Sequence, residues 1–301
     1  MIGGSGITGR PSAARRRDYG GPADLRAMQD LVQRTWSLDR SWHIGDLAWQ
    51  RFMHTGREPE WPTALWERDG EVVAWGWTRL PGTLSLSVRP GLDGLAGAVL
   101  DWFHGLATAP VREVTVLETE ADLVATLGGH GYRRRQPDPR TLLRTVRDLD
   151  DLPAPTVPDG FVVRPVRGPD DLAARVAVHR AAFAPSRVTE ESYAAVMAAW
   201  PYRSALDRVV ETPDGRFAAF CLAWLDTVNR VGLLEPVGAH PEFRRLGLAR
   251  AACLGALHAL RTAGATRAVV ETYAGSGAEQ LYRSLGFRAH TRTATFALTV
   301  S

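Results

Sequence analysis

A short basic segment near the C-terminal end of the sequence has the composition of an anion-binding turn. It covers residues 237–250 and follows an apolar run, 231–237, that is short enough to be a buried strand. Small and apolar residues then recur mainly at helical spacing, which predicts the order strand, turn and helix. Gly247 would let the backbone approach a ligand, and the helix start would offer free N–H groups. With Arg244 and Arg245 beside it, the predicted anion is phosphate.

Two motifs give this region a family resemblance. Arg244, Gly247 and Ala249 fit the Arg/Gln-x-x-Gly-x-Gly/Ala loop, which resembles the pyrophosphate loop of the GNAT superfamily of N-acetyltransferases. Segment 278–287 reads Ala-Glu-Gln-Leu-Tyr-Arg-Ser-Leu-Gly-Phe and is similar to the family's Ala-x-x-Leu-Tyr-x-x-x-Gly-Phe helix and turn. One departure is Gly275, where many family members carry an asparagine that contacts the coenzyme, so one hydrogen bond is in doubt.

The resemblance implies acetyl-CoA as the acyl-donor substrate, held along one continuous segment. The implied coenzyme-binding residues are Val237, Gly238, Ala239, Arg244, Arg245, Leu246, Gly247, Leu248, Ala249 and Arg250. Backbone N–H groups near Val237 and Ala239 would polarise the thioester carbonyl, as oxyanion donors do.

Acetyl transfer to an amine also needs a base and an acid. An alkylammonium has a pKa of about 10.4, so little free base is present at neutral pH and a general base would help. Glu235 is the candidate base, acting directly or through water, because it shares a strand face with Val237; the alternative is a carboxylate that faces solvent or pairs with Arg230. Tyr282 is the candidate acid for the leaving thiolate, carried over from the family motif; the alternative is a packed aromatic residue.

Two histidines are weaker candidates for catalysis. His240 precedes Pro241 at the turn, where exposure explains it best, and His179 lies on an apolar helical face as a hydrogen-bonded core or cleft-lining residue.

Composition limits the classes of function. The net charge is only +3, and the sequence has no lysine, so nucleic acid binding is not indicated. Its two cysteines lie in apolar runs without a ligand spacing to histidine, so we expect neither a metal site nor a disulfide. No apolar run approaches the ~20 residues of a membrane span. Residues 1–14 lack a hydrophobic signal segment, and we expect a cytoplasmic protein.

The sequence contains two similar halves. Residues 17–25 and 164–172 share Arg, Gly, Pro, Asp and Leu at matching places, and Asp69-Gly70 and Asp214-Gly215 each predict a hairpin. Further matches pair 94–96 with 247–249 and 131–132 with 286–287. One fold is therefore predicted twice, as residues 1–147 and 161–301 joined by the proline-rich linker 148–160.

The first copy keeps the predicted fold but lacks the residues of the predicted coenzyme and catalytic site. Its loop has glycine in place of Arg244 and carries Asp93, which would repel a diphosphate, and Leu127 takes the place of Tyr282. We therefore expect a degenerate N-terminal domain that packs against the catalytic C-terminal domain or walls its cleft. Its dense tryptophans are expected mainly in the core, with an aromatic substrate wall as the second interpretation.

The predicted fold class is α/β (α+β), with two tandem GNAT folds, each a mixed, mostly antiparallel sheet flanked by helices. In the second half, strands are expected at 161–166, 208–211, 216–225, 231–237, 267–273 and 288–299, and helices at 170–183, around 193–200, after 247 and at 278–285.

The predicted function is acetyl-CoA-dependent N-acetylation of a small-molecule amine by direct transfer. The two-copy layout resembles that of mycothiol synthase, which acetylates an amine on a sugar-linked cysteine; an aminoglycoside, a polyamine and a protein N-terminus also stay open as acceptors. The alternatives are an acetyl-CoA-binding regulatory module without turnover and a purely structural interaction protein.

Overall fold

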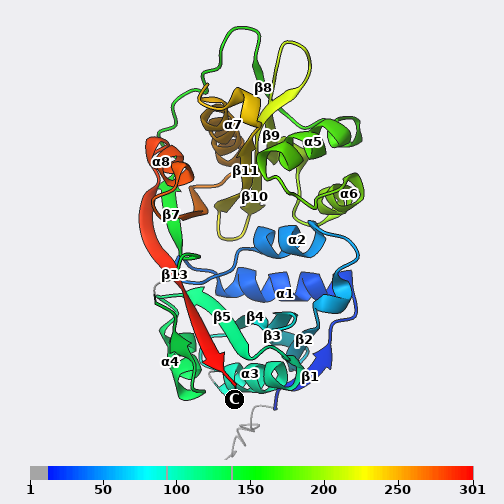
Figure 1. Ribbon diagram of the computed structural model, residues 1–301, viewed down its shortest axis with the longest axis vertical. Coiled ribbons are helices and arrows are strands. Elements are labelled where there is room, and N and C mark those ends of the chain that lie inside the picture. Colours follow the sequence, from blue (N-terminus) through cyan, green and yellow to red (C-terminus); the bar gives the residue numbers. More distant parts are fainter. Residues whose placement is uncertain (1–12, 93, 137, 301) are drawn as a thin grey trace, which may run out of the picture.

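The computed structural model describes residues 13–92, 94–136 and 138–300 (Figure 1). Most of residues 1–14, and Asp93, lie outside the described residues. The first half contains β1 (Arg15–Asp18), α1 (Pro22–Thr35), α2 (Ile44–Phe52), β2 (Thr63–Arg68), β3 (Glu71–Arg79), β4 (Thr83–Val88), α3 (Gly94–Leu106), β5 (Val111–Leu117), α4 (Ala121–Gly129), β6 (Arg133–Arg134) and β7 (Leu142–Asp148).

The second half repeats this order in outline. It contains β8 (Val162–Pro165), α5 (Leu172–Ala182), α6 (Glu190–Ala198), β9 (Asp207–Glu211), β10 (Phe217–Asp226), β11 (Val231–Ala239), α7 (Leu248–Thr262), β12 (Arg267–Tyr273), α8 (Gly277–Ser284) and β13 (Arg288–Thr299). The predicted strands and helices of this half are confirmed to within two residues at most ends. Thr189 caps α6: its hydroxyl oxygen accepts the N–H of Ser192, and its own N–H donates to the hydroxyl oxygen of Ser192. None of the described helices is both long and apolar enough to cross a membrane.

The described strands form one continuous 13-stranded sheet, in which most neighbours are antiparallel. The two parallel neighbours are β4 with β5 and β11 with β12. The predicted fold class is thereby confirmed. Asp69 and Gly70 both have positive φ, so the β2–β3 connection is the predicted tight hairpin turn.

The last strand of each half pairs with the sheet of the other half. β7 pairs with β12 and β13 pairs with β5, while β7 and β13 also pair with each other. In Figure 1, β13 runs from the second half, at the top, into the first half, at the bottom. The sequence gives no signal for this exchange, and the boundaries predicted at 147 and 161 stay predictions.

Helix α2 of the first half packs directly on β10 of the second half. A Cβ atom on Gly45 would lie 2.2 Å from the ring of Trp224, so only glycine allows this approach. His43 and Asp46 form a capping box at the start of α2, which fixes where the helix begins.

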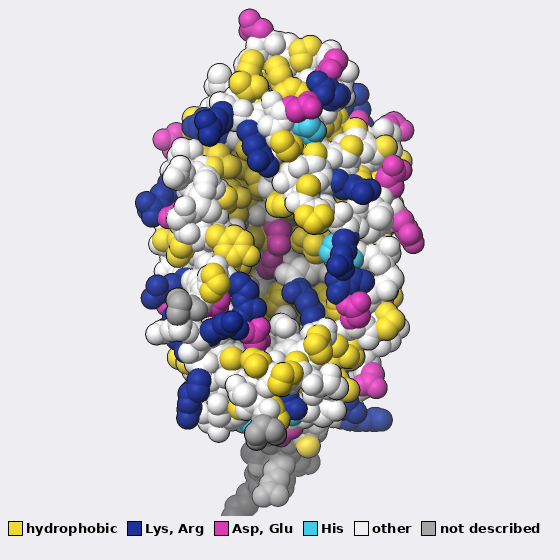
Figure 2. All heavy atoms as spheres, in the orientation of Figure 1, with side chains coloured by type: hydrophobic (Ala, Val, Ile, Leu, Met, Phe, Trp, Pro, Cys, Tyr) yellow, Lys and Arg dark blue, Asp and Glu magenta, His cyan; other side chains and the backbone are white. Residues whose placement is uncertain are grey.

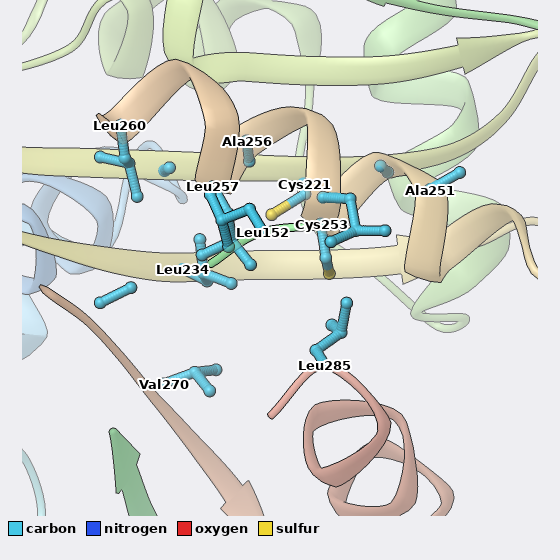
Figure 3. Close-up of a cluster of buried hydrophobic side chains, with 14 of the residues drawn as sticks. Leu152, Cys221, Leu234, Ala251, Cys253, Ala256, Leu257, Leu260, Val270 and Leu285 are labelled. Carbon is cyan, nitrogen blue, oxygen red and sulfur yellow. The ribbon is translucent and has the colours of Figure 1, made fainter. Parts of the chain in front are cut away.

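The core of the second half lies between α7 and the central strands (Figure 3). Every residue of β10 is buried, as expected for a strand covered on both faces. Figure 3 shows Leu257 and Leu260 of α7 directed toward the strands, with Leu285 below them. Both cysteines are free and buried in this cluster, as predicted.

A fully buried ion pair connects α5 to β9. Arg175 Nε donates to Asp207 Oδ1 over 3.0 Å, and both side chains are 0% exposed. Tyr193 also donates its hydroxyl to Asp207, and the guanidinium of Arg175 lies 3.9 Å from the ring centroid of Phe220. This network holds α5 and α6 against the sheet.

Breaking this pair should destabilise the fold strongly. Asp207→Asn would leave Arg175 charged and buried without its counter-ion, which costs about 3–5 kcal/mol in comparable cases. Asp18→Asn is the matched control, because its pair with Arg16 is exposed and should cost less than about 1 kcal/mol. Urea unfolding of both variants measures the difference, and equal losses would contradict this interpretation.

Candidate functional site

The site begins where two parallel strands part. β11 and β12 pair only at Val231 with Arg267, Gly232 with Ala268 and Leu233 with Val269. Beyond these pairs, residues 234–237 of β11 and 271–273 of β12 line one cavity instead of bonding to each other. The gap between the strands is therefore the opening of the site.

The backbone of β11 is exposed toward this gap. His240 donates its N–H to the carbonyl of Ala218 at 2.8 Å, and Gly238 faces Phe220 in the same register. Because backbone groups alternate in direction along a strand, Val237 and Ala239 point away from β10. These two residues are those predicted to offer N–H groups to a ligand.

A cavity of about 730 Å³, called here the α7 cavity, lies at the start of α7. Nine of the ten predicted coenzyme-binding residues line it; Leu246 does not, and that residue is 49% exposed. Sequence reasoning missed the opposite wall, which α5 and α8 supply. The lining residues are Ala182, Phe183, Val237, Gly238, Ala239, Phe243, Arg244, Arg245, Gly247, Leu248, Ala249, Arg250, Gly277, Ala278, Gln280, Leu281, Tyr282 and Ser284.

The α7 cavity has the electrostatics of an anion site. Gly247 has φ +77°, a conformation that favours glycine, and no side chain caps the N-terminus of α7. Arg244 and Arg245 are exposed, and within the described part of the chain neither makes an ion pair. Free backbone donors and unpaired guanidinium groups therefore converge on one space.

A second cavity of about 610 Å³, called here the α2 cavity, lies between the halves. Figure 2 shows this face hollowed near its middle, with acidic side chains in the hollow and basic ones around it. Its lining residues are Trp49, Met53, His54, Arg57, Leu142, His179, Phe183, Pro185, Ser186, Arg187, Leu234, Glu235, Pro236, Val237, Glu271, Thr272, Tyr273, Ser276, Ala278 and Tyr282.

The two cavities share four residues, Phe183, Val237, Ala278 and Tyr282. Tyr282 is 6% exposed and packs edge-on against Phe287. Burial raises its phenol pKa well above the ordinary value, so the hydroxyl keeps its proton. Both predicted catalytic residues, Glu235 and Tyr282, line the α2 cavity.

Glu235 has an acidic partner from the other half of the chain. Its carboxyl shares a hydrogen bond with Asp46 of α2, and burial together with this carboxyl raises the Glu235 pKa well above the ordinary range. Burial likewise raises the Asp46 pKa to about 6. Two adjacent carboxyl groups share protons in this way because both cannot ionise cheaply. The alternative, in which Glu235 pairs with Arg230, is not what the structure shows: Arg230 donates to the carbonyl of Gly264.

A third carboxylate, Glu271 of β12, is held by Arg144 of β7. Arg144 donates to Glu271 Oε1 over 3.1 and 2.6 Å and also to the carbonyls of Arg40 and Ser41. The exchanged strand thus orients an acidic group on the wall of the α2 cavity and ties it to the first half.

The two histidines differ in part from expectation. His179 lines the α2 cavity as predicted, but the expectation of a hydrogen-bonded ring is wrong for Nδ1, which is buried without a partner. Burial and the nearby Arg175 lower the His179 pKa to about 3, so the ring is neutral. His240 is only partly exposed; it accepts the N–H of Glu242 at the turn and does not line either cavity.

Comparisons with known proteins identify the family of this chain. Residues 175–287 match the model of the acetyltransferase (GNAT) family. The mycothiol acetyltransferase of Tsukamurella paurometabola is 34% identical over 70% of this chain and 71% of its own length. That of Nocardia farcinica is 30% identical over 74% and 78%. The chain belongs to the GNAT acetyltransferase family. It is an N-acetyltransferase.

Solved structures support the same fold. A GNAT protein of Sphaerobacter thermophilus has a TM-score of 0.62 at 20% identity and covers 95% of each chain. A tandem GNAT protein from the clavulanic acid biosynthesis pathway has a TM-score of 0.63 at 15% identity, over 95% of this chain and 98% of that one. Both likenesses extend across the two halves of this GNAT protein.

Among the described residues of the first half, the cavity between the end of β4, the start of α3 and α4, which corresponds in place to the α7 cavity, is small. A cavity of only about 10 Å³ lies there, among Arg40, Val88, Arg89, Pro90, Ala96, Asp122, Leu123 and Thr126. That is about the space of one water molecule. In the described residues no group of three or more His, Cys, Asp or Glu side chains is placed to hold a metal ion.

The Asp46–Glu235 pair should make the stability of the fold depend on pH. Because the folded Asp46 pKa lies above its ordinary value of 3.8, the folded state binds more protons between about pH 4 and 6, and stability falls as pH rises through this window. Asp46→Asn should remove that fall. In chemical unfolding, the free energy of unfolding of the variant should therefore rise relative to that of the wild type from pH 4 to 6.

A control of opposite sign is Asp24→Asn. The hydrogen bond from Arg17 lowers the Asp24 pKa, so the stabilisation by this carboxylate grows as pH rises toward its ordinary pKa of 3.8 and is complete above it. The variant should therefore lose stability relative to the wild type as pH rises to about 4, and keep a constant deficit from pH 4 to 6. If Asp46→Asn behaved like Asp24→Asn, the carboxyl pair described above would be incorrect.

Proposed function

We propose that this N-acetyltransferase uses acetyl-CoA as donor and acetylates the amine of a small molecule by direct transfer, at a site in its C-terminal half. The observation that carries the proposal is the junction of the α7 and α2 cavities at Val237 and Tyr282. A donor bound in one cavity and an acceptor bound in the other would meet at this junction.

The α7 cavity would hold the coenzyme. Its diphosphate would lie against Arg244, Arg245 and the N–H groups that open α7, where positive charge is unpaired. The pantetheine arm would extend along β11, whose Val237 and Ala239 backbone groups face the gap. In that position an N–H group of β11 can stabilise the oxyanion of the tetrahedral intermediate.

The carboxyl pair would bind and deprotonate the amine. An arriving ammonium favours the ionised form of a nearby carboxyl, so Glu235 with Asp46 can hold the cation and then accept its proton, directly or through water. The free amine attacks the thioester carbon, the tetrahedral intermediate collapses, and the C–S bond breaks. Tyr282 gives its proton to the departing thiolate, because its raised pKa keeps it protonated until that step. The nitrogen of the intermediate loses its second proton as the amide forms, and that proton restores the Tyr282 hydroxyl, directly or through water.

The acceptor of the relatives gives one candidate substrate class. Two relatives at 30–34% identity are mycothiol acetyltransferases, so an amine on a thiol-bearing sugar conjugate is a reasonable first acceptor to test. Glu235 and Glu271 on the wall of the α2 cavity suit an acceptor whose amine arrives as a cation.

Coenzyme binding can be tested at Gly247. Gly247→Val would force a branched side chain into a left-handed backbone position and into the α7 cavity, and should weaken acetyl-CoA binding by at least about tenfold, since even one charged hydrogen bond is worth that much. Gly264→Val is the matched control: Gly264 has φ +98° and open space around its Cβ, but it lies at the other end of α7. Calorimetric titration should show the loss only for Gly247→Val; equal affinities would refute the assignment.

The enzyme can be separated from a coenzyme-binding module by thiol release. Tyr282→Phe should lower kcat for acetyl transfer to an amine by about 10²–10⁴-fold while acetyl-CoA still binds. Tyr132→Phe is the control, because it removes a buried hydroxyl that bonds His104 far from both cavities. Absence of thiol release with every amine of a broad panel, in the presence of tight acetyl-CoA binding, would favour the regulatory alternative.

A further inference from the structure

One part of the α2 cavity wall carries two arginines and a histidine, and one of these arginines has no anionic partner among the described residues. His54 and Arg57 follow α2 in the first half, and Arg187 lies between α5 and α6 in the second half; all three line the cavity. Arg57 and Arg187 both act on His54 and lower its pKa, after burial, so the three groups lie close together.

His54, Arg57 and Arg187, called here the basic cluster, differ in whether they have partners. Arg57 pairs with Glu60. Arg187 is exposed to solvent at the cavity wall, and within the described residues it makes no hydrogen bond and no ion pair, although its charge acts on Glu60. His54 Nδ1 is buried and has no hydrogen-bond partner in the described structure. Buried polar atoms in native proteins normally have partners, so this nitrogen on the cavity wall is open to a hydrogen bond with a bound ligand or water.

The basic cluster is distinct from the place where the amine would react. The charges that act most on Glu235 are those of Asp46, Glu271 and Arg79, and not those of Arg57 or Arg187. The cavity therefore has an acidic region beside Tyr282 and a separate basic region formed jointly by the two halves. A ligand of one charge sign would suit only one of them.

We propose that the acetyl acceptor carries an oxyanion, either a carboxylate or a phosphate, besides its amine, and that Arg187, Arg57 and His54 bind this oxyanion while the amine lies at Glu235. This inference rests on the proposed function and adds the substrate class. Guanidinium groups bind carboxylate and phosphate oxygens through two parallel bonds, which fixes orientation as well as charge. Arg187 is accordingly a specificity residue, and its loop is part of the acceptor site.

The test compares acceptors that differ only in this oxyanion. ω-Amino acids of increasing chain length are each paired with their carboxamide, and ω-aminoalkyl phosphates with the corresponding amino alcohol; kcat/KM is measured for each at saturating acetyl-CoA. At the chain length that spans the cavity, the anionic member should be preferred by about 10–100-fold, mainly through KM, which is the range of a charged hydrogen bond. The carboxylate and phosphate series decide between the two oxyanions.

Variants of Arg187 complete the test. Arg187→Gln should bring the preference close to one, and Arg187→Glu should reverse it, so that a diamine becomes better than the amino acid. Arg180→Gln is the control, since Arg180 is exposed on α5 and does not line the cavity. Acetylation of charged and neutral members at equal rates, or a preference that survives Arg187→Gln, would overturn this inference alone. Failure to acetylate any amine would overturn the proposed function itself.

Discussion

The parting of β11 and β12 is the constraint on which the site depends. Three residue pairs hold the strands together at one end, and beyond Leu233 and Val269 the sheet loses its hydrogen bonds. Unpaired backbone groups are costly when buried, so a gap of this kind persists where water or a ligand can satisfy them. Every feature of the site follows from this gap: the free N–H groups of Val237 and Ala239, the exposed start of α7, and the position of Tyr282 across from β11.

The first half of the chain completes the second. β7 lies beside β12 and carries Arg144, which orients Glu271, while α2 brings Asp46 to Glu235 and Trp49 to the cavity wall. The approach of α2 is possible because Gly45 lies against Trp224. Among the described residues of the first half, the corresponding cavity holds only about 10 Å³. This small volume fits an arrangement in which the second copy would bind the donor and the first copy would shape the acceptor site.

The sequence predicts this architecture well where the signal is local. The loop with Gly247, the helix with Tyr282 and the face of Glu235 are encoded by spacing and by turn chemistry, and the structure brings them together. Asp46 and Arg144 could not be found in this way, because their roles arise from contacts across the two halves. Arg187 could not be found either, because its proposed role depends on a cavity that both halves line. Strand exchange is a long-range pairing, and β7 and β13 have ordinary strand sequences that do not reveal which sheet they join.

The central claim is that a diphosphate-bearing donor lies in the gap beside β11, and a crystal structure with coenzyme A tests it most directly. The account predicts density for the diphosphate at Arg244 and Gly247, with the sulfur between Val237 and the hydroxyl of Tyr282. Coenzyme density elsewhere on the molecule, or a sulfur directed away from Tyr282, would contradict it.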